Sequence, residues 1–224
     1  MVCSKMRWRV GRHTLICDDS TSIAVPGRAT VLIYDPPWDA VLPQPHRGFR
    51  HVFAFTDPRH LPSTLINFGI PSWVFTWDCV SSWWTPSSPL MRLKFCAWFG
   101  PRCEYSQDRY LLAKKQPARR VKNNRGAYNY KGRPGTILSD VYCQPITEPR
   151  AHRHAKPLDW VAAMLGNCIA RPSVIYDPFA GSGTSLLAAE RTGHTAILVE
   201  RCPSEVDKML ARFEQSELEI NQFS

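Results

Sequence analysis

Two short apolar runs, each closed by an aspartate and a proline, constrain the fold of this chain most. The first runs from Thr30 to Asp35 (TVLIYD, followed by PPW), and the second from Ser173 to Asp177 (SVIYD, followed by PF). Short β-branched runs of this kind are typical of strands that are buried on both faces of a parallel sheet. An acid at the end of such a strand lies at the carboxyl edge of the sheet, where open α/β folds bind ligands. Both strand ends are therefore predicted to border an active site.

The residues that follow Asp177 predict a helix and a second strand. Glycines fill a turn after the acid, Thr184 to Arg191 is a run of good helix formers, and Gly193 is a typical helix stop. Thr195 to Glu200 then has the pattern of another buried strand, and it again ends in an acid. This segment is predicted to form a strand, helix and strand in turn.

Other parts of the chain continue this alternation. Apolar spacing predicts a helix from Pro157 to about Ala170, and a last amphipathic helix that begins with a capping box of Ser204 and Asp207. Three further runs have the composition of strands: 51–56, 73–78 and 95–99. Strands that alternate with helices indicate a doubly wound sheet. We expect a single α/β domain over residues 1–224, built on a Rossmann-like sheet.

The positive charge of the chain is concentrated in one stretch. The sequence has 28 Lys and Arg against 19 Asp and Glu, a net charge of +9, and residues 109–139 contain nine of these basic residues and no acid. Interleaved tyrosines and asparagines suit stacking and hydrogen bonding with bases. We interpret 109–139 as a basic target-recognition insertion, with a solvated basic loop as the alternative. The expected nucleic-acid-binding residues are Lys114, Lys115, Arg119, Arg120, Lys122, Arg125, Lys131 and Arg133.

Several protein classes are disfavoured by what the sequence lacks. No apolar run approaches the roughly 18 to 20 residues that cross a bilayer, and the first residues lack the apolar core of a secretory leader. No two cysteines are close enough for a CxxC metal or redox motif. We expect a cytoplasmic protein with reduced cysteines, no metal and no membrane partner.

The glycine turn predicts a cofactor that contains adenosine. Gly181 and Gly183 could cradle a phosphate, a dinucleotide or another adenosine compound, and a plain tight turn is the structural alternative. No lysine follows Gly183, which disfavours a P-loop, and Leu186 replaces the third glycine of a dinucleotide fingerprint. An adenosine cofactor without a pyrophosphate remains, and Glu200 is placed to accept hydrogen bonds from its ribose.

The segment Asp35-Pro36-Pro37-Trp38 indicates a particular chemistry more specifically than the glycine turn does. Two prolines fix the backbone, so the aspartate carboxylate and the neighbouring carbonyls are held as acceptors, and Trp38 offers a flat face for stacking. The exocyclic amine of a base is a poor nucleophile because its lone pair is delocalised into the ring. Two acceptors that take its hydrogens would push this lone pair towards an electrophile. A simple turn is the alternative interpretation of these four residues.

Four motifs in this order resemble the S-adenosylmethionine-dependent amino methyltransferases of DNA, in the permuted order that places the catalytic motif first. DPPW at 35–38 resembles the catalytic D-P-P-Y/F/W motif, and DPFAGSGT at 177–184 is similar to the cofactor loop. HRHAKPL at 152–158 resembles the family's H-x-x-x-K-P-L element. ICDDS at 16–20 resembles its G-D-S/A turn, with Asp19 in the place of the acid and Asp18 in that of the glycine. The resemblance spans about residues 14–202.

The resemblance implies methyl transfer from S-adenosylmethionine to an adenine flipped out of double-stranded DNA. The acidic first position of DPPW is similar to the adenine-N6 members, because cytosine-N4 members usually begin with serine. The catalytic residues that it implies are Asp35, Pro36, Pro37 and Trp38. The cofactor-binding residues expected from the resemblance and from the turn are Asp19, Lys156, Pro157, Asp177, Phe179, Gly181, Gly183, Thr184 and Glu200.

Other functions stay open at this point. An RNA adenine-N6 methyltransferase, a DNA cytosine-N4 methyltransferase and a catalytically silent nucleic-acid-binding subunit share most of these features. A nicotinamide oxidoreductase is disfavoured by the missing third glycine. The recognition sequence and its stringency, a place in restriction-modification, and a homodimer as the oligomeric state are not fixed by the sequence.

Overall fold

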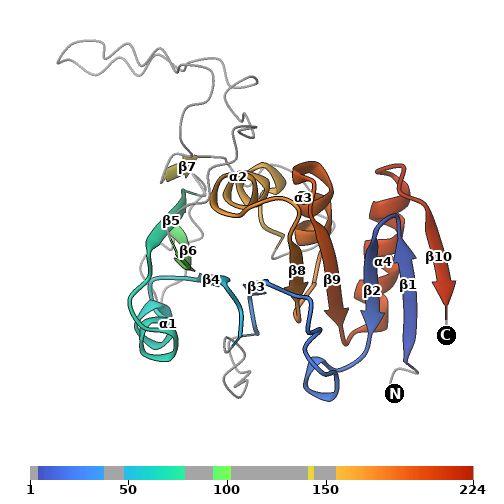
Figure 1. The fold of residues 1–224 in the computed structure, drawn as a ribbon, viewed down its shortest axis with the longest axis horizontal. Coiled ribbons are helices and arrows are strands. Elements are labelled where there is room, and N and C mark those ends of the chain that lie inside the picture. The colour runs from blue at the N-terminus through green and yellow to red at the C-terminus, as the bar shows by residue number, and fades with distance from the viewer. Residues whose placement is uncertain (1–4, 38–47, 79–92, 102–140, 144–154, 224) are drawn as a thin grey trace, which may run out of the picture.

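One large sheet organises the chain. The computed structural model describes residues 5–37, 48–78, 93–101, 141–143 and 155–223. Within these ranges the strands form a ten-stranded sheet in the order β10-β1-β2-β9-β8-β3-β4-β6-β5-β7 (Figure 1). The strands are β1 (Met6–Val10), β2 (His13–Cys17), β3 (Val31–Tyr34), β4 (His51–Thr56), β5 (Trp73–Asp78), β6 (Leu93–Phe99), β7 (Val141–Cys143), β8 (Val174–Asp177), β9 (Thr195–Glu200) and β10 (Ile220–Phe223).

The middle of the sheet is parallel and its flanks are mixed. Strands β2, β9, β8, β3 and β4 are parallel neighbours, so their carboxyl ends share one edge. On one flank β1 is antiparallel to both β2 and β10. On the other flank β6 is antiparallel to β4 and β5, and β7 is parallel to β5. The carboxyl ends of β4 and β5 and the start of β6 therefore lie at the same edge as the ends of the central strands.

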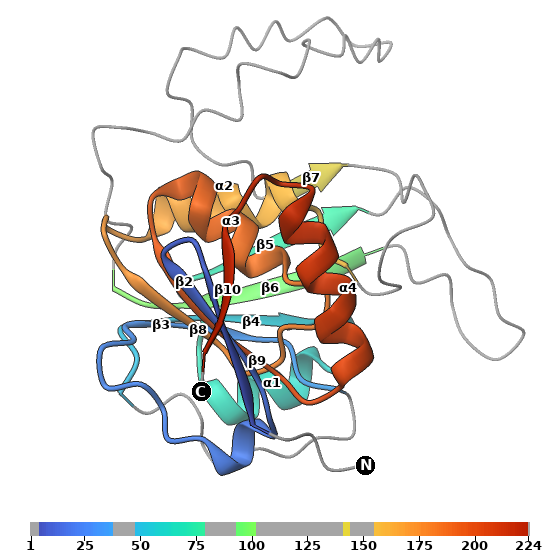
Figure 2. The same cartoon turned by 90° about the vertical axis from the view of Figure 1, so that its right-hand side faces the viewer.

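Helices cover both faces of this sheet. They are the short 3-10 turn η1 (Ser20–Ser22) and the helices α1 (Leu61–Phe68), α2 (Leu158–Cys168), α3 (Thr184–Thr192) and α4 (Pro203–Glu214). Figure 2 shows α2 and α3 on one side of the central strands and α1 on the other. This is the doubly wound arrangement that the alternation of elements predicts.

The period-two alternation of buried strands builds a core on each face. Val31 and Ile33 pack in the larger core, which contains Trp160 of α2 and Phe213 of α4. Leu32, between them in the sequence, faces the other way into a second core against which Phe68 of α1 packs. Because both faces of β3 are covered, its sequence is a continuous apolar run instead of an alternating one.

Most elements expected from the sequence are confirmed. The expected strands correspond to β3, β4, β5, β6, β8 and β9, and the expected helices to α2, α3 and α4. The capping box at the start of α4 is wrong, because the helix begins at Pro203, and Cys202 occupies the cap without a side-chain hydrogen bond. Proline suits the first turn because its fixed φ is already helical and it has no N–H that needs a partner.

The structure also bears on what the sequence led us to expect of the cysteines and of membrane-spanning segments. Cys17 is disulfide-bonded, which corrects the expectation that the cysteines are all reduced, whereas Cys96, Cys168 and Cys202 form no disulfide. In the described part of the chain, no helix is long and apolar enough to cross a membrane. The basic stretch 109–139 and Trp38 lie outside the described residues.

Candidate active site

Four acidic residues lie in a row along the carboxyl edge of the parallel strands. Asp18 follows β2, Glu200 ends β9, Asp177 ends β8 and Asp35 follows β3, and these strands are consecutive in the sheet. Neighbouring strands lie about 4.8 Å apart, so the row of four ends extends over roughly 14 Å. Open parallel sheets bind ligands at this edge, as the two Asp-Pro strand ends predict.

Asp35 is held by a lysine that comes from a distant part of the sequence. The Nζ atom of Lys156 donates a hydrogen bond to Oδ2 of Asp35, and the two side chains are 17% and 31% exposed. The same ammonium lies 5.2 Å from the centroid of the Phe55 ring on β4. Pro36 is half-buried and Pro37 is exposed. The ion pair fixes the carboxylate at the carboxyl edge of the sheet. The sequence did not predict this ion pair, because the family resemblance placed Lys156 only beside the cofactor.

Asp177 is an acid inside the protein. It is 4% exposed, and it accepts hydrogen bonds from the Phe179 N–H at 3.0 Å and the Ser185 hydroxyl at 2.5 Å. Burial raises the pKa of Asp177 to about 7, and the negative charges of Asp35 and Glu200 act in the same direction. The two hydrogen bonds oppose this rise. Asp177 therefore holds the turn after β8 and carries a proton over part of the neutral pH range.

The turn after β8 requires glycine because of its backbone conformation and its packing against α4. Gly181 and Gly183 have φ angles of +51° and +71°. A Cβ atom on Gly183 would lie 2.5 Å from Cζ of Phe213 and 3.1 Å from Cγ of Met209, both on α4. A side chain at this position would meet α4, so the need for glycine here does not depend on a bound ligand. The cofactor role of Gly183 stays a prediction.

Glu200 ties three strand ends together. Its Oε2 accepts a hydrogen bond from the Gly181 N–H and its Oε1 one from the Cys202 N–H, both at 2.9 Å. Its backbone carbonyl accepts from the Asp18 N–H at 3.1 Å. A carboxylate has about four lone-pair sites, so each oxygen can still accept another hydrogen bond. This arrangement is compatible with the ribose contact that the sequence suggests.

The two acids that follow β2, Asp18 and Asp19, have different surroundings. Asp19 is exposed, and its Oδ1 accepts from the N–H and the hydroxyl of Thr21 at 2.8 and 2.7 Å, capping η1. These hydrogen bonds lower the pKa of Asp19. Asp18 is half-buried and stands next to the Glu200 backbone. Asp19 remains the predicted cofactor acid, although one of its oxygens is already engaged in the turn.

The remaining expected cofactor residues surround the same turn. The hydroxyl of Thr184 is buried and lies 3.0 Å from the Ser182 hydroxyl. The half-buried ring of Phe179 meets the Tyr34 ring at 5.8 Å, which joins the turn after β8 to the end of β3. Pro157 is half-buried at the start of α2.

One residue that holds the site was not predicted from the sequence. The guanidinium of Arg212 on α4 donates to the Ser182 carbonyl at 2.7 Å and to the Thr184 hydroxyl at 3.0 Å. Burial lowers the pKa of Arg212. The apolar spacing of this segment predicted the helix, but it gave no sign that a polar side chain on α4 would hold the glycine turn.

A family model for DNA methylases, N6_N4_Mtase, matches residues 76–211. The matched span includes the turn after β8, Asp177 and Glu200. The chain belongs to this DNA methylase family. Its members are S-adenosylmethionine-dependent DNA methyltransferases that act on exocyclic amines. This methylase is therefore assigned to DNA methyl transfer, and the model's N6/N4 family covers both kinds of target amine.

Solved structures share the fold of this methylase. The M1.HpyAVI–SAM complex has 15% sequence identity and a TM-score of 0.53, over 89% of this chain and 98% of the other. The PvuII DNA methyltransferase (cytosine-N4-specific) has 15% identity and a TM-score of 0.64, over 95% and 90%. No curated protein matches the sequence significantly. At this level of identity the similarity concerns the fold, and it confirms the expected methyltransferase sheet.

Proposed function

We propose that this methylase transfers the methyl group of S-adenosylmethionine to the N6 amine of an adenine that has flipped out of double-stranded DNA. The observation that carries the adenine assignment is the acidic residue at the first position of the 35–38 motif. Asp35 stands directly after β3 with its carboxylate at the edge of the sheet. A serine there, the usual residue of cytosine-N4 enzymes, would offer a hydroxyl and no negative charge.

The contacts of Asp35 support its role as acceptor. Lys156 engages Oδ2, so Oδ1 can accept a hydrogen of the target amine, while the Pro36 carbonyl accepts the other. With both hydrogens engaged, the lone pair of the amine is available for attack. Holding the reacting atoms roughly 3 to 3.5 Å apart and in line then supplies much of the rate. Trp38, next in the sequence, is proposed to stack on the base.

The residues at the other strand ends suit an adenosine cofactor. When bound, S-adenosylmethionine supplies a sulfonium methyl group as the electrophile. The acceptor sites left on Glu200 and the half-buried ring of Phe179 are an acceptor and packing set that suits an adenosine. The residues proposed to bind it are Asp19, Lys156, Pro157, Asp177, Phe179, Gly181, Gly183, Thr184 and Glu200.

Target recognition is proposed to come from the basic stretch 109–139, within a single methyltransferase domain over residues 1–224. Its nine basic residues and lack of acids suit the phosphates of DNA. The recognition region is short, which favours site-specific or weakly specific methylation over a long recognition sequence.

Cytosine-N4 methylation is the second candidate. The fold is similar to that of a cytosine-N4-specific enzyme, and cytosine carries an exocyclic amine with the same need for two acceptors. The two are separated by incubating the protein with isotopically labelled S-adenosylmethionine and duplex DNA or RNA, followed by digestion and mass spectrometry of the nucleosides. Labelled N6-methyldeoxyadenosine is expected. Labelled N4-methyldeoxycytidine, a label confined to RNA, or no label would each refute the proposal.

A further inference from the structure

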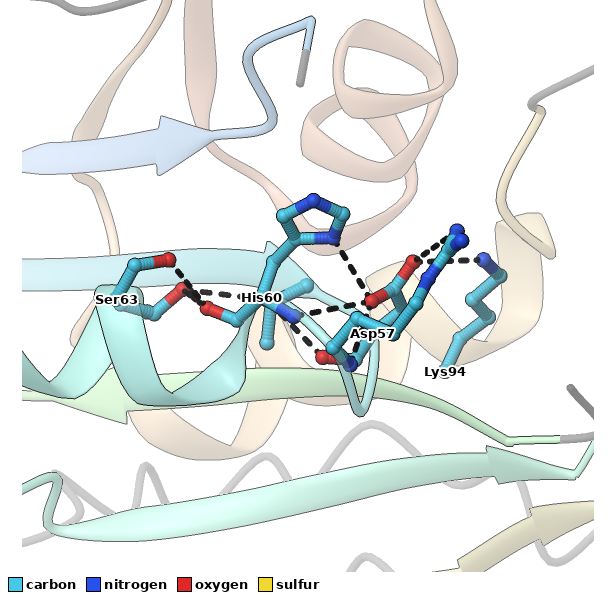
Figure 3. A network of polar contacts seen from close by, with 7 residues as sticks. Asp57, His60, Ser63 and Lys94 are labelled. Carbon is cyan, nitrogen blue, oxygen red and sulfur yellow. Dashed lines mark hydrogen bonds and ion pairs between the residues drawn. The ribbon is translucent and has the colours of Figure 1, made fainter. Parts of the chain in front are cut away.

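A cluster of three basic side chains surrounds a buried carboxylate at the end of β4. Figure 3 shows Asp57, directly after this strand, with His60 and Lys94 around it. Asp57 is fully buried, whereas the side chains of Arg59, His60 and Lys94 are 58%, 35% and 30% exposed. The cluster is separate from the residues assigned above to the amine and the cofactor. Its ion pairs join this one carboxylate to an arginine, a lysine and a histidine.

One oxygen of Asp57 organises the start of α1. Its Oδ1 accepts hydrogen bonds from the Arg59 N–H at 2.9 Å and the His60 N–H at 3.1 Å, and it lies 2.9 Å from Nδ1 of His60 (Figure 3). Burial by itself would raise the pKa of Asp57, but the hydrogen bonds from His60 and Arg59 and the charge of Lys94 outweigh burial and lower it. Asp57 is therefore an anion that fixes the backbone on which Arg59 and His60 stand.

The other oxygen holds two cations without bonding closely to either. Oδ2 of Asp57 lies 3.6 Å from the Arg59 guanidinium and 3.8 Å from the Lys94 ammonium, and it has no hydrogen-bond partner in the described part of the chain. A guanidinium has five N–H donors in a planar fork that suits a phosphate. The carboxylate thus orients Arg59, and at this distance the donors of its fork can turn to another acceptor.

The sheet places this cluster beside the proposed target amine. In the parallel pair of β3 and β4, Tyr34 is opposite Ala54, so Asp57 stands two residues further along its strand than Asp35 does. At about 3.3 Å per residue and about 4.8 Å between strands, the two positions are separated by roughly 8 Å. Each DNA strand carries a phosphate about every 3.4 Å along the helix axis. A strand whose base reaches Asp35 therefore has phosphates within reach of the cluster.

We propose that Arg59 and Lys94, with His60, form a binding site for a backbone phosphate of the methylated strand, and that Asp57 holds this site in place. The inference rests on the proposed function in that the target base sits at Asp35. It assigns to the β4 end a contact with the target strand that is independent of the basic stretch 109–139. A phosphate held here would help fix the nucleotide whose base leaves the helix.

The test is the salt dependence of binding to a duplex of arbitrary sequence, because phosphate contacts do not depend on the recognition site. The variant is the double substitution Arg59→Gln with Lys94→Gln. Arg59→Lys with Lys94→Arg keeps both charges. The matched control is Arg7→Gln with Arg9→Gln, which removes two exposed positive charges from β1 at the far end of the sheet. Thermal unfolding and S-adenosylmethionine calorimetry establish that each protein is folded.

The slope of log affinity against log salt should flatten by about 0.9 for each phosphate that is no longer neutralised, so by about 0.9 in the double variant, which leaves one phosphate without its cations. The charge-keeping variant and the β1 control should retain the wild-type slope. A wild-type slope in the folded double variant, or an equal flattening in the β1 control, would overturn the phosphate site. Which base is methylated does not enter this readout, so the adenine assignment can fail while the site stands. A wild-type protein without salt-dependent DNA binding would refute the proposed function itself.

Discussion

The proton on Asp177 should make the stability of this protein depend on pH in a direction that is unusual for an aspartate. Its pKa rises from 3.8 to about 7 on folding, mainly because burial disfavours the charged form. Between these values the folded protein holds a proton that the unfolded chain has released. Stability that is present below about pH 4 should therefore be lost as the pH rises through about 7.

The size of this effect follows from the shift. A difference of about 3 pKa units at about 1.4 kcal/mol per unit corresponds to at most about 4 kcal/mol. Asp177→Asn should remove the effect, because an asparagine oxygen can accept from the Phe179 N–H and its amide can donate to the Ser185 hydroxyl. The free energy of unfolding of the variant, relative to wild type, should rise by up to about 4 kcal/mol between about pH 4 and about pH 8.

Urea unfolding of both proteins across this range measures the difference. Burial lowers the pKa values of His51 and His194 to about 4, and their contributions to stability rise with pH over the acid part of the range. Subtracting the two profiles cancels these histidines. Asp207→Asn removes an exposed carboxylate from α4 and serves as the control. A difference profile for Asp177→Asn that is as flat as this control would refute the conclusion that Asp177 is buried with a raised pKa.

Three other predictions concern the catalytic motif, the glycine turn and the basic stretch. Asp35→Asn should lower kcat by at least about 100-fold while DNA and S-adenosylmethionine affinities persist, because the charge matters most as the amine attacks; near-normal turnover would contradict the mechanism. Gly183→Ala should lower the free energy of unfolding by about 1 to 3 kcal/mol in urea experiments, because the position has a positive φ and the new Cβ would contact Phe213. The control is Gly27→Ala, which should be nearly neutral because a Cβ there meets no atom within 4 Å. Removing four charges of the basic stretch should flatten the salt slope of DNA binding by up to roughly 3 to 4 units, and an unchanged slope would make this stretch a solvated loop. The four substitutions are Lys114→Ala, Lys115→Ala, Arg119→Ala and Arg120→Ala.

The buried strands could be predicted from the sequence because local pattern and tertiary burial agree there. β4, β5 and β9 have the same bounds as the expected runs, since each is apolar and bordered by polar or turn-forming residues. The flanking strands β1, β2 and β10 were not predicted, although in β1 exposed arginines alternate with buried Trp8 and Val10, which is the pattern of a half-buried strand. Helix α1 was not predicted either, although Leu61, Leu65 and Phe68 fall at helical spacing, because it is only eight residues long and has a proline in its first turn.

The residues of the candidate site likewise fall into those that a local sequence pattern predicts and those that it does not. The acids and glycines at strand ends are visible in the sequence, because a strand followed by Asp-Pro or by a glycine turn is a local pattern. The ion pair of Lys156 with Asp35 joins residues 121 positions apart, and the contact of Arg212 with the turn joins α4 to residues 28 and 30 positions away. Such contacts depend on how helices dock on the sheet, which no local pattern specifies.

The pairing of β1 with β10 brings the first and last described strands side by side (Figure 1). Arg7 lies opposite Phe223, so a short linker could join these strands and make the chain a closed ring without disturbing any strand pair. If the ring were then opened between β4 and α2, the new chain would carry the glycine turn ahead of Asp35 in the same sheet. The order of the two motifs along the gene is thus a matter of where the ring is cut, and a circularly permuted version of this methylase should fold around the same site.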